Sequence, residues 1–229
     1  MRRVFFLPIV GAMLAVFLIV LVFMVPLILF GIIGRTLHRF GLPWYGFLLF
    51  LIFSLMGSTV NVPLWKIRTD VPVIIMRYAY FMGIPYPIPS IESKESYTTV
   101  SINVGGAIMP LILSSYLLMV NSAAIPASFF AILSISMLTY FLSRPVQGLG
   151  IVVPGFIPPI LTAIVALLVG GEYAPVVAYV GGTVGTLLGA DLFHKGDFKK
   201  LGASNVSIGG AGTFDGIFLT GLIALLLAS

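Results

Sequence analysis

The sequence predicts an all-α, polytopic integral membrane protein with about seven transmembrane helices and glycine-rich breaks. Of its 229 residues, 59% are hydrophobic and only 8% are charged, whereas a soluble domain is roughly 25% charged. The mean hydropathy of +1.16 indicates that lipid is the solvent for most of the surface. The net charge of +5 lies in the loops, so the expected partner is the lipid bilayer and not nucleic acid.

Seven apolar segments approach the roughly 20 residues that a bilayer requires. The first follows two arginines but exceeds a signal-peptide core of ~7–15 residues, and no small-residue cleavage site closes it, so we interpret it as a retained span. We expect the segments to form a single transmembrane domain over residues 1–229. They cover residues 4–33, 44–60, 100–120, 123–142, 149–169, 174–193 and 206–228.

One long polar stretch, residues 64–99, separates the second segment from the third. It contains charges of both signs and four prolines, at positions 72, 85, 87 and 89. Residues 71–81 are compatible with a short amphipathic helix in the membrane interface. Residues 86–89 are expected to be extended, because proline disfavours helix for its predecessor. We interpret the whole stretch as a connector peripheral to any site.

Two carboxylates stand out, because the chain has only 7 acidic residues. Asp191 ends the sixth segment, and Asp215 lies near the start of the seventh, after a run of glycines. A carboxylate at membrane depth is costly and marks a functional site by default. Glycine-rich backbone is a poor helix, so we expect residues 204–212 to be irregular. The helix would begin near Thr213, with Asp215 in its first turn.

Irregular backbone in that place would bring Asp215 to about the depth of Asp191. Two facing carboxylates do not both ionise readily, so the pair can share a proton and act together as acid and base on a water molecule. The expected substrate is a membrane protein or peptide. The expected substrate-binding residues lie in the two glycine-rich breaks: Gly209, Gly210, Gly212, Asn103 and Ser207.

No cofactor or metal is expected. Cysteine is absent, and no phosphate loop, dinucleotide fingerprint, serine elbow or zinc motif occurs. His194, three residues after Asp191, is better explained as an interfacial residue than as a metal ligand. The oligomeric state has no signature in the sequence.

Other interpretations of the acids remain open. Asp191 could be an interfacial residue solvated with Lys195, and Asp215 a helix N-terminal charge bonded to neighbouring polar residues. A transporter or channel is the alternative function, in which the breaks near Asn103 and Ser207 form a polar site and Asp215 binds a cation or proton. A membrane scaffold without catalysis is the third alternative.

The two breaks resemble each other. Residues 103–107 read NVGGA and residues 207–211 read SIGGA. The apolar segments around them are predicted to run in the same direction, which would give a parallel repeat related by an axis along the membrane normal.

Several motifs together resemble a prokaryotic multi-pass membrane family known as domain of unknown function sixteen-fourteen. They are NVGGA with Pro110, GAD at residues 189–191 and SIGGAGTFDGIFLTG at residues 207–221. A weaker resemblance is to intramembrane aspartyl peptidases of the presenilin and prepilin-peptidase kind. Those carry one aspartate on each of two helices, the second in a Gly-x-Gly-Asp motif. Here two further residues separate the glycines from Asp215, and Asp191 follows alanine instead of tyrosine. That resemblance implies catalysis by Asp191 and Asp215.

Basic residues predict the orientation of the chain in the cell membrane. With seven spans, ten of the 12 lysines and arginines fall on the side of the N-terminus, which is therefore cytoplasmic, and the C-terminus lies outside. Reporter domains fused at Arg2 and Ser229 should report opposite sides of the membrane. Reporters on one side would require an even number of spans.

Overall fold

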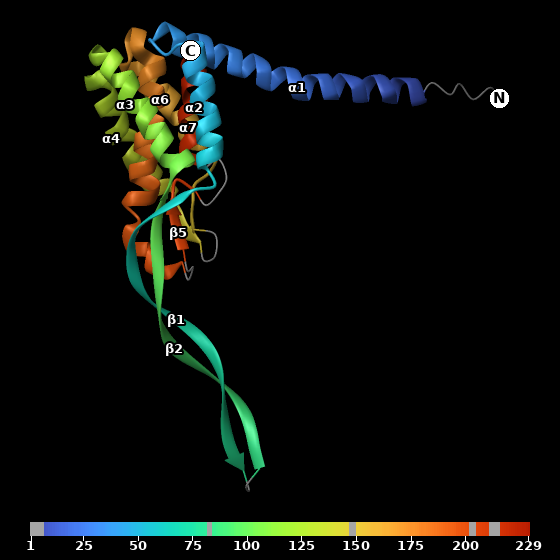
Figure 1. Cartoon of the computed structure of the whole chain (residues 1–229), viewed down its shortest axis with the longest axis vertical. Coiled ribbons are helices and arrows are strands. Elements are labelled where there is room, and N and C mark those ends of the chain that lie inside the picture. Colours follow the sequence, from blue (N-terminus) through green and yellow to red (C-terminus); the bar gives the residue numbers. More distant parts are fainter. Residues whose placement is uncertain (1–6, 82–83, 147–149, 202–204, 211–215) are drawn as a thin grey trace, which may run out of the picture.

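The computed structural model describes residues 7–81, 84–146, 150–201, 205–210 and 216–229 (Figure 1). The protein is mostly helical, and each of the seven predicted apolar segments overlaps one of the α-helices of the described ranges. These helices are α1 (Leu7–Arg39), α2 (Trp44–Gly57), α3 (Met109–Val120), α4 (Ile125–Leu142), α5 (Ile157–Val169), α6 (Ala174–Thr186) and α7 (Gly216–Leu227).

The helical surface has the character of one that faces lipid. Met119 is 81% exposed and Leu168 is 79% exposed, although both are large and apolar. Two helical stretches, Ser122–Leu142 and Gly171–Leu192, are long and apolar enough to cross a membrane. Helices α2, α3, α5 and α7 are equally apolar but have 14, 12, 13 and 12 residues, fewer than the roughly 20 of a regular span.

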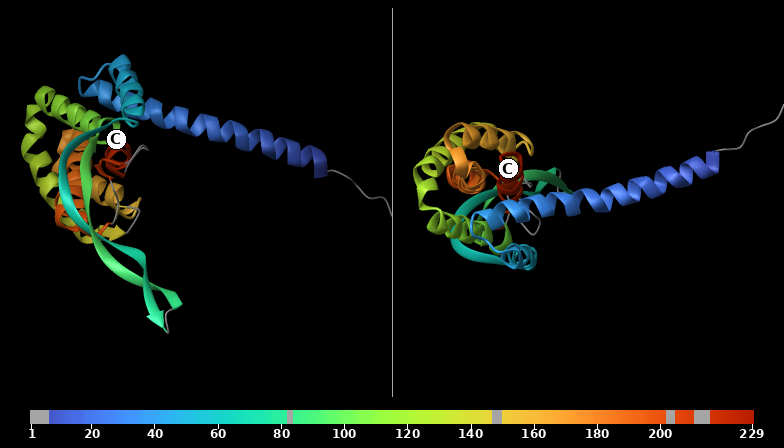
Figure 2. Two further views of the ribbon diagram at one scale, coloured as in Figure 1. Left: turned by 60° about the horizontal axis from the view of Figure 1, so that its bottom comes forward. Right: turned by 90° about the horizontal axis from the view of Figure 1, so that it is seen from above.

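Helix α6 is the centre of the bundle. Figure 2 shows it enclosed by α3, α4, α5 and α7, while α1 extends away from them. Glycines allow this enclosure, because a Cβ atom on Gly181 would lie 2.7 Å from Ala131 Cβ and one on Gly185 would lie 2.8 Å from Ile135 Cβ. The small-residue spacing of α6 therefore serves close packing against α4, as such spacing commonly does in membrane helices.

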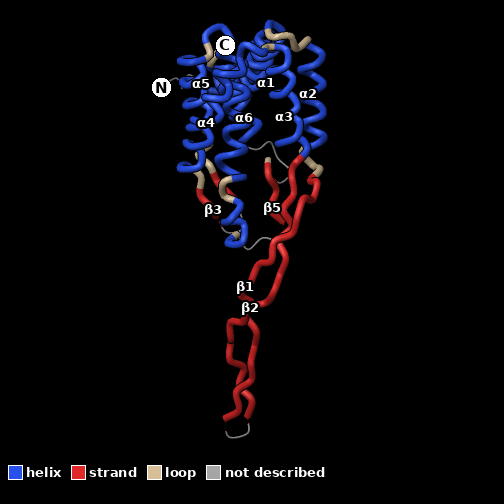
Figure 3. The backbone as a smooth tube through the Cα atoms, turned by 90° about the vertical axis from the view of Figure 1, so that its left-hand side faces the viewer, coloured by secondary structure: helices blue, strands red, loops and turns tan. Residues whose placement is uncertain are grey.

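Strands form where the sequence predicted only helices and a connector. Strands β1 (Asn61–Phe81) and β2 (Ile84–Asn103) make a long antiparallel hairpin, and β5 (Asn205–Ile208) pairs in parallel with the base of β2. Strands β3 (Arg144–Val146) and β4 (Gly150–Val152) form a second, small hairpin. All of them lie at one end of the bundle, and the long hairpin extends away from it (Figure 3).

The all-α class is therefore wrong in this region, and so is the predicted amphipathic helix over residues 71–81. Residues 69–75 include five β-branched residues, which favour an extended backbone: Thr69, Val71, Val73, Ile74 and Ile75. Proline lacks an N–H and obstructs a helix interior. In a two-stranded ribbon each strand keeps one unpaired edge, where proline is tolerated. The predicted third, fifth and seventh spans likewise begin in strands, at residues 100–103, 150–152 and 205–208.

The packing of α6 on α4 can be tested at Gly185. Replacing Gly185 by alanine should destabilise the protein by about 1–3 kcal/mol, because overpacking a tight contact costs that much, although alanine is the better helix former by ~1 kcal/mol. Thermal unfolding in detergent measures the effect as a lower Tm. Gly155→Ala is the matched control, since no atom lies within 4 Å of its Cβ position. Equal Tm values for the two variants would contradict this packing.

Candidate functional site

Asp191 lies in a π-helical segment, η4 (Leu187–Leu192), which continues α6 towards the strands. Such segments are rare and often occur at functional sites. The side chain is half-buried, and its Oδ2 accepts a hydrogen bond of 3.0 Å from the N–H of Gly209. One of the two predicted acids therefore connects the end of the central helix to the glycine-rich break before α7.

Gly209 and Gly210 turn the chain at the end of β5, with φ values of +82° and +88°. This left-handed region favours glycine. A Cβ atom on Gly209 would lie 2.6 Å from Ala107 Cβ, and one on Gly106 would collide with the carbonyl oxygen of Gly209. The two glycine-rich breaks thus pack backbone against backbone. The predicted non-helical stretch, residues 204–212, is confirmed for the described residues 205–210.

Asn103 joins the same two breaks through a fully buried side chain. Its Nδ2 donates to Ser58 O at 2.7 Å and to Asn61 Oδ1 at 3.1 Å, while its Oδ1 accepts from the N–H of Gly106 at 2.7 Å. Asn61 Oδ1 also accepts from Ser207 Oγ at 2.6 Å. Asn103 and Ser207, expected to line one site, therefore share Asn61 as an acceptor.

The strands that lead into the two breaks are neighbours. Ser101 of β2 is paired with Ser207 of β5, and Ile102 with Ile208, in parallel register. Strand β2 continues through the π-helical segment η1 (Val104–Ile108) into α3. The strand register pairs Ser207 with Ser101 and not with Asn103, so it is offset by two residues from the alignment of the suggested repeat.

The structure brings together Asp191, Gly209, Gly210, Asn103 and Ser207. Gly212 and Asp215 lie outside the described residues, as does the separation between the two acids. The start of α7 is described, and there Ile217 shares a buried apolar cluster with Leu187 of η4 and Ala107 of η1. The beginning of α7 and the segment that carries Asp191 thus contribute to one buried apolar cluster.

Sequence reasoning missed two contributors to this region. Asn61 directly follows the second apolar segment, and an amide in that position could have indicated a buried polar contact. His194 is buried, with its ring centroid 4.7 Å from that of Tyr140. Its Nδ1 lies 3.2 Å from Gly189 O, so the ring packs between α4 and η4. Within the described ranges, no group of three His, Cys, Asp or Glu residues could hold a metal ion.

Comparison with known sequences assigns the chain to a family. A family model with the description "Protein of unknown function (DUF1614)" matches residues 55–227. The chain belongs to this family, and the match includes both breaks and Asp191. Comparisons with curated proteins and with solved structures gave no match.

Asn103 should be essential for stability. Replacing Asn103 by alanine removes three hydrogen bonds from a buried site and leaves the Gly106 N–H without its acceptor, which should cost about 1–3 kcal/mol. Asn205→Ala is the control, because Asn205 is exposed and accepts one hydrogen bond, from Ser101 Oγ. The Tm in detergent should fall clearly for the first variant and little for the second. A reversed order would refute the assigned role of Asn103.

Proposed function

We propose that this DUF1614 protein is an aspartyl-type intramembrane hydrolase, which cleaves peptide bonds in membrane-protein or peptide substrates with Asp191 and Asp215. The observation that carries the proposal is the hydrogen bond from the Gly209 N–H to Asp191 Oδ2. It holds one acid against the glycine-rich segment that leads, within six residues, to the other acid.

Packing at the start of α7 supports a short distance between the acids. Ile217 follows Asp215 by two residues in the chain and packs in one cluster with Leu187. Leu187 begins the same π-helical segment that carries Asp191. On this proposal the two carboxyl groups lie close enough to share one proton, because a second ionisation beside the first is strongly disfavoured.

The chemistry follows from that shared proton. The ionised carboxylate takes a proton from water as the oxygen attacks the peptide carbonyl carbon, and the protonated carboxyl donates its proton to the carbonyl oxygen. Collapse of the tetrahedral intermediate breaks the C–N bond and transfers a proton to the leaving amine. Gly209 can present its N–H to Asp191 only because it lacks a side chain, which would collide with Ala107.

The membrane arrangement is part of the proposal. All seven helices would cross the cell membrane, with the N-terminus in the cytoplasm and the C-terminus outside. The short helices would complete their spans with the η segments and strand ends that adjoin them, since non-helical backbone is tolerated at depth where protein buries it. Asp191 would then lie near the cytoplasmic face.

A transporter or channel is the second candidate. One observation favours it: the breaks near Asn103 and Ser207 meet at Asn61 and form a polar cluster. Polar sites of transporters commonly lie at non-helical backbone of this kind. In that case Asp215 would bind a proton or cation. The side-chain hydrogen bonds of Asn103 are made to other protein groups, which gives it a positioning role in either function.

Substitution of the acids tests the hydrolase. The full chain, reconstituted in liposomes with a panel of fluorophore-labelled membrane-spanning peptides, should cleave at least one of them. Asp191→Asn and Asp215→Asn should each lower the rate by roughly 10²–10⁴-fold, because the proton transfer is lost. Asp197→Asn, an acid outside the site, should retain the rate. Cleavage products are measured by mass spectrometry.

The same variants separate chemistry from structure. Asparagine at position 191 keeps an oxygen that accepts the Gly209 N–H, so Tm should stay unchanged, whereas Asp191→Ala should lower Tm as well as activity. Full cleavage by Asp191→Asn would rule out the proposed role of this acid. Absence of cleavage by the wild type, together with proton entry reported by a pH-sensitive dye inside the liposomes, would favour the transporter.

A further inference from the structure

A large groove separates the base of the long hairpin from the end of the central helix. Its volume is about 960 Å³, at the upper end of the roughly 300–1,000 Å³ of small-molecule sites. Aromatic and aliphatic side chains from β1, α4 and the region of η4 line it, together with one lysine: Trp65, Ile67, Tyr140, Leu192, Phe193 and Lys195.

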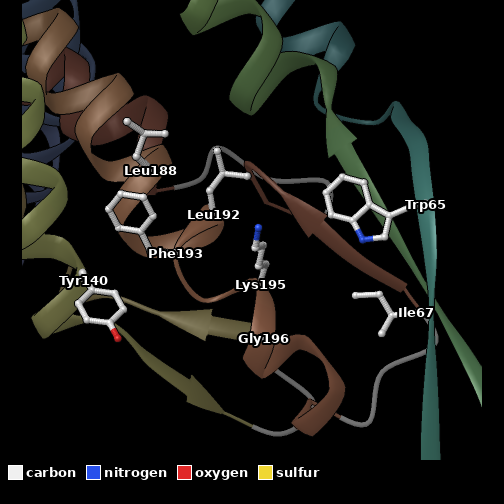
Figure 4. Close-up of a pocket in the computed structure, with 8 residues that line it drawn as sticks. All are labelled: Trp65, Ile67, Tyr140, Leu188, Leu192, Phe193, Lys195 and Gly196. Carbon is white, nitrogen blue, oxygen red and sulfur yellow. The ribbon is translucent and has the colours of Figure 1, made fainter.

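Lys195 is the distinctive member of this lining. Figure 4 shows its ammonium group directed into the space between Leu192 and Trp65. Among the residues that the structure describes, no carboxylate forms an ion pair with Lys195. Lys195 is exposed, and its positive charge beside an apolar wall complements a ligand that has a negatively charged head and an apolar tail.

The rest of the lining is suited to an amphiphile at the surface of a bilayer. Trp65 and Tyr140 are each 41% exposed and Phe193 is 55% exposed, so the groove is open along its side. Tryptophan and tyrosine are typical of the headgroup level, where one edge of the ring is wet and the other contacts acyl chains. Leu192 and Phe193 continue the apolar wall along the end of α6.

We propose that this groove binds an anionic phospholipid, with the phosphate at Lys195 Nζ and an acyl chain along Leu192 and Phe193. The proposal rests on the membrane arrangement given above and not on hydrolysis. On that arrangement the groove faces the cytoplasmic leaflet, where anionic lipids are concentrated. A zwitterionic lipid would fill the same apolar wall but would bring a second cation towards Lys195.

Native mass spectrometry of the full chain tests the proposal. The protein is released from detergent micelles containing phosphatidylglycerol or phosphatidylcholine with identical acyl chains. The wild type should retain one phosphatidylglycerol with an affinity about fivefold above that for phosphatidylcholine, as expected for one lysine at a membrane surface. Lys195→Gln should abolish this preference, and Lys195→Arg should restore it.

Two further variants keep the outcome interpretable. Lys66→Gln is the matched control, since Lys66 adjoins Trp65 on β1 but does not line the groove, and it should leave the preference unchanged. Trp65→Ala should weaken binding of both lipids, because it removes apolar contact and no charge. Three results would each overturn the proposal: an unchanged preference in Lys195→Gln, an equal loss in Lys66→Gln, or no retained lipid in the wild type. Cleavage by Asp191 and Asp215 should persist in Lys195→Gln, so failure here is distinct from failure of the hydrolase.

Discussion

The structure depends on how backbone polar groups are satisfied at the two glycine-rich breaks, which follow β2 and β5. A buried N–H or C=O without a partner is costly, so each break needs partners inside the protein. Pairing of β2 with β5 supplies some of them, the Asn103 side chain supplies the acceptor for Gly106, and Asp191 supplies the acceptor for Gly209. The proposed catalytic acid is therefore also one of the groups that make the break tolerable.

The sequence predicts an element correctly where one local property of the residues, such as hydrophobicity or backbone preference, determines the structure. Apolar runs of sufficient length locate all seven helices, and the glycines around position 209 predict a non-helical break because they are poor in helix and free to adopt positive φ. The close packing of α6 on α4 depends on residue size alone, since Gly181 and Gly185 have no side chains that would hold the helices apart. Asp191 could be singled out because a carboxylate is so rare in this chain.

The hairpin could not be predicted in the same way, because its formation depends on a pairing partner distant in the chain. Residues 64–99 mix charges, prolines and β-branched residues, a pattern compatible with an interfacial helix or with a ribbon. The ribbon forms because Asn61–Phe81 and Ile84–Asn103 pair along their whole length. The pairing has one irregularity, between Pro63 and Trp65. The same limitation applies to Asn61, whose partners Asn103 and Ser207 are far away in sequence.

The long hairpin has a mechanical consequence. A strand of 21 residues at ~3.3 Å per residue is about 70 Å long, and its base is the strand β2 that pairs with β5 over Thr99–Ile102. The ribbon thus continues directly into the strand pairing at one end of the bundle. A load applied at the far end would reach Thr99–Ile102 first, then Gly209, and through the Gly209 N–H the carboxylate of Asp191. A partner that binds the far part of the ribbon would therefore be connected through the backbone to Asp191.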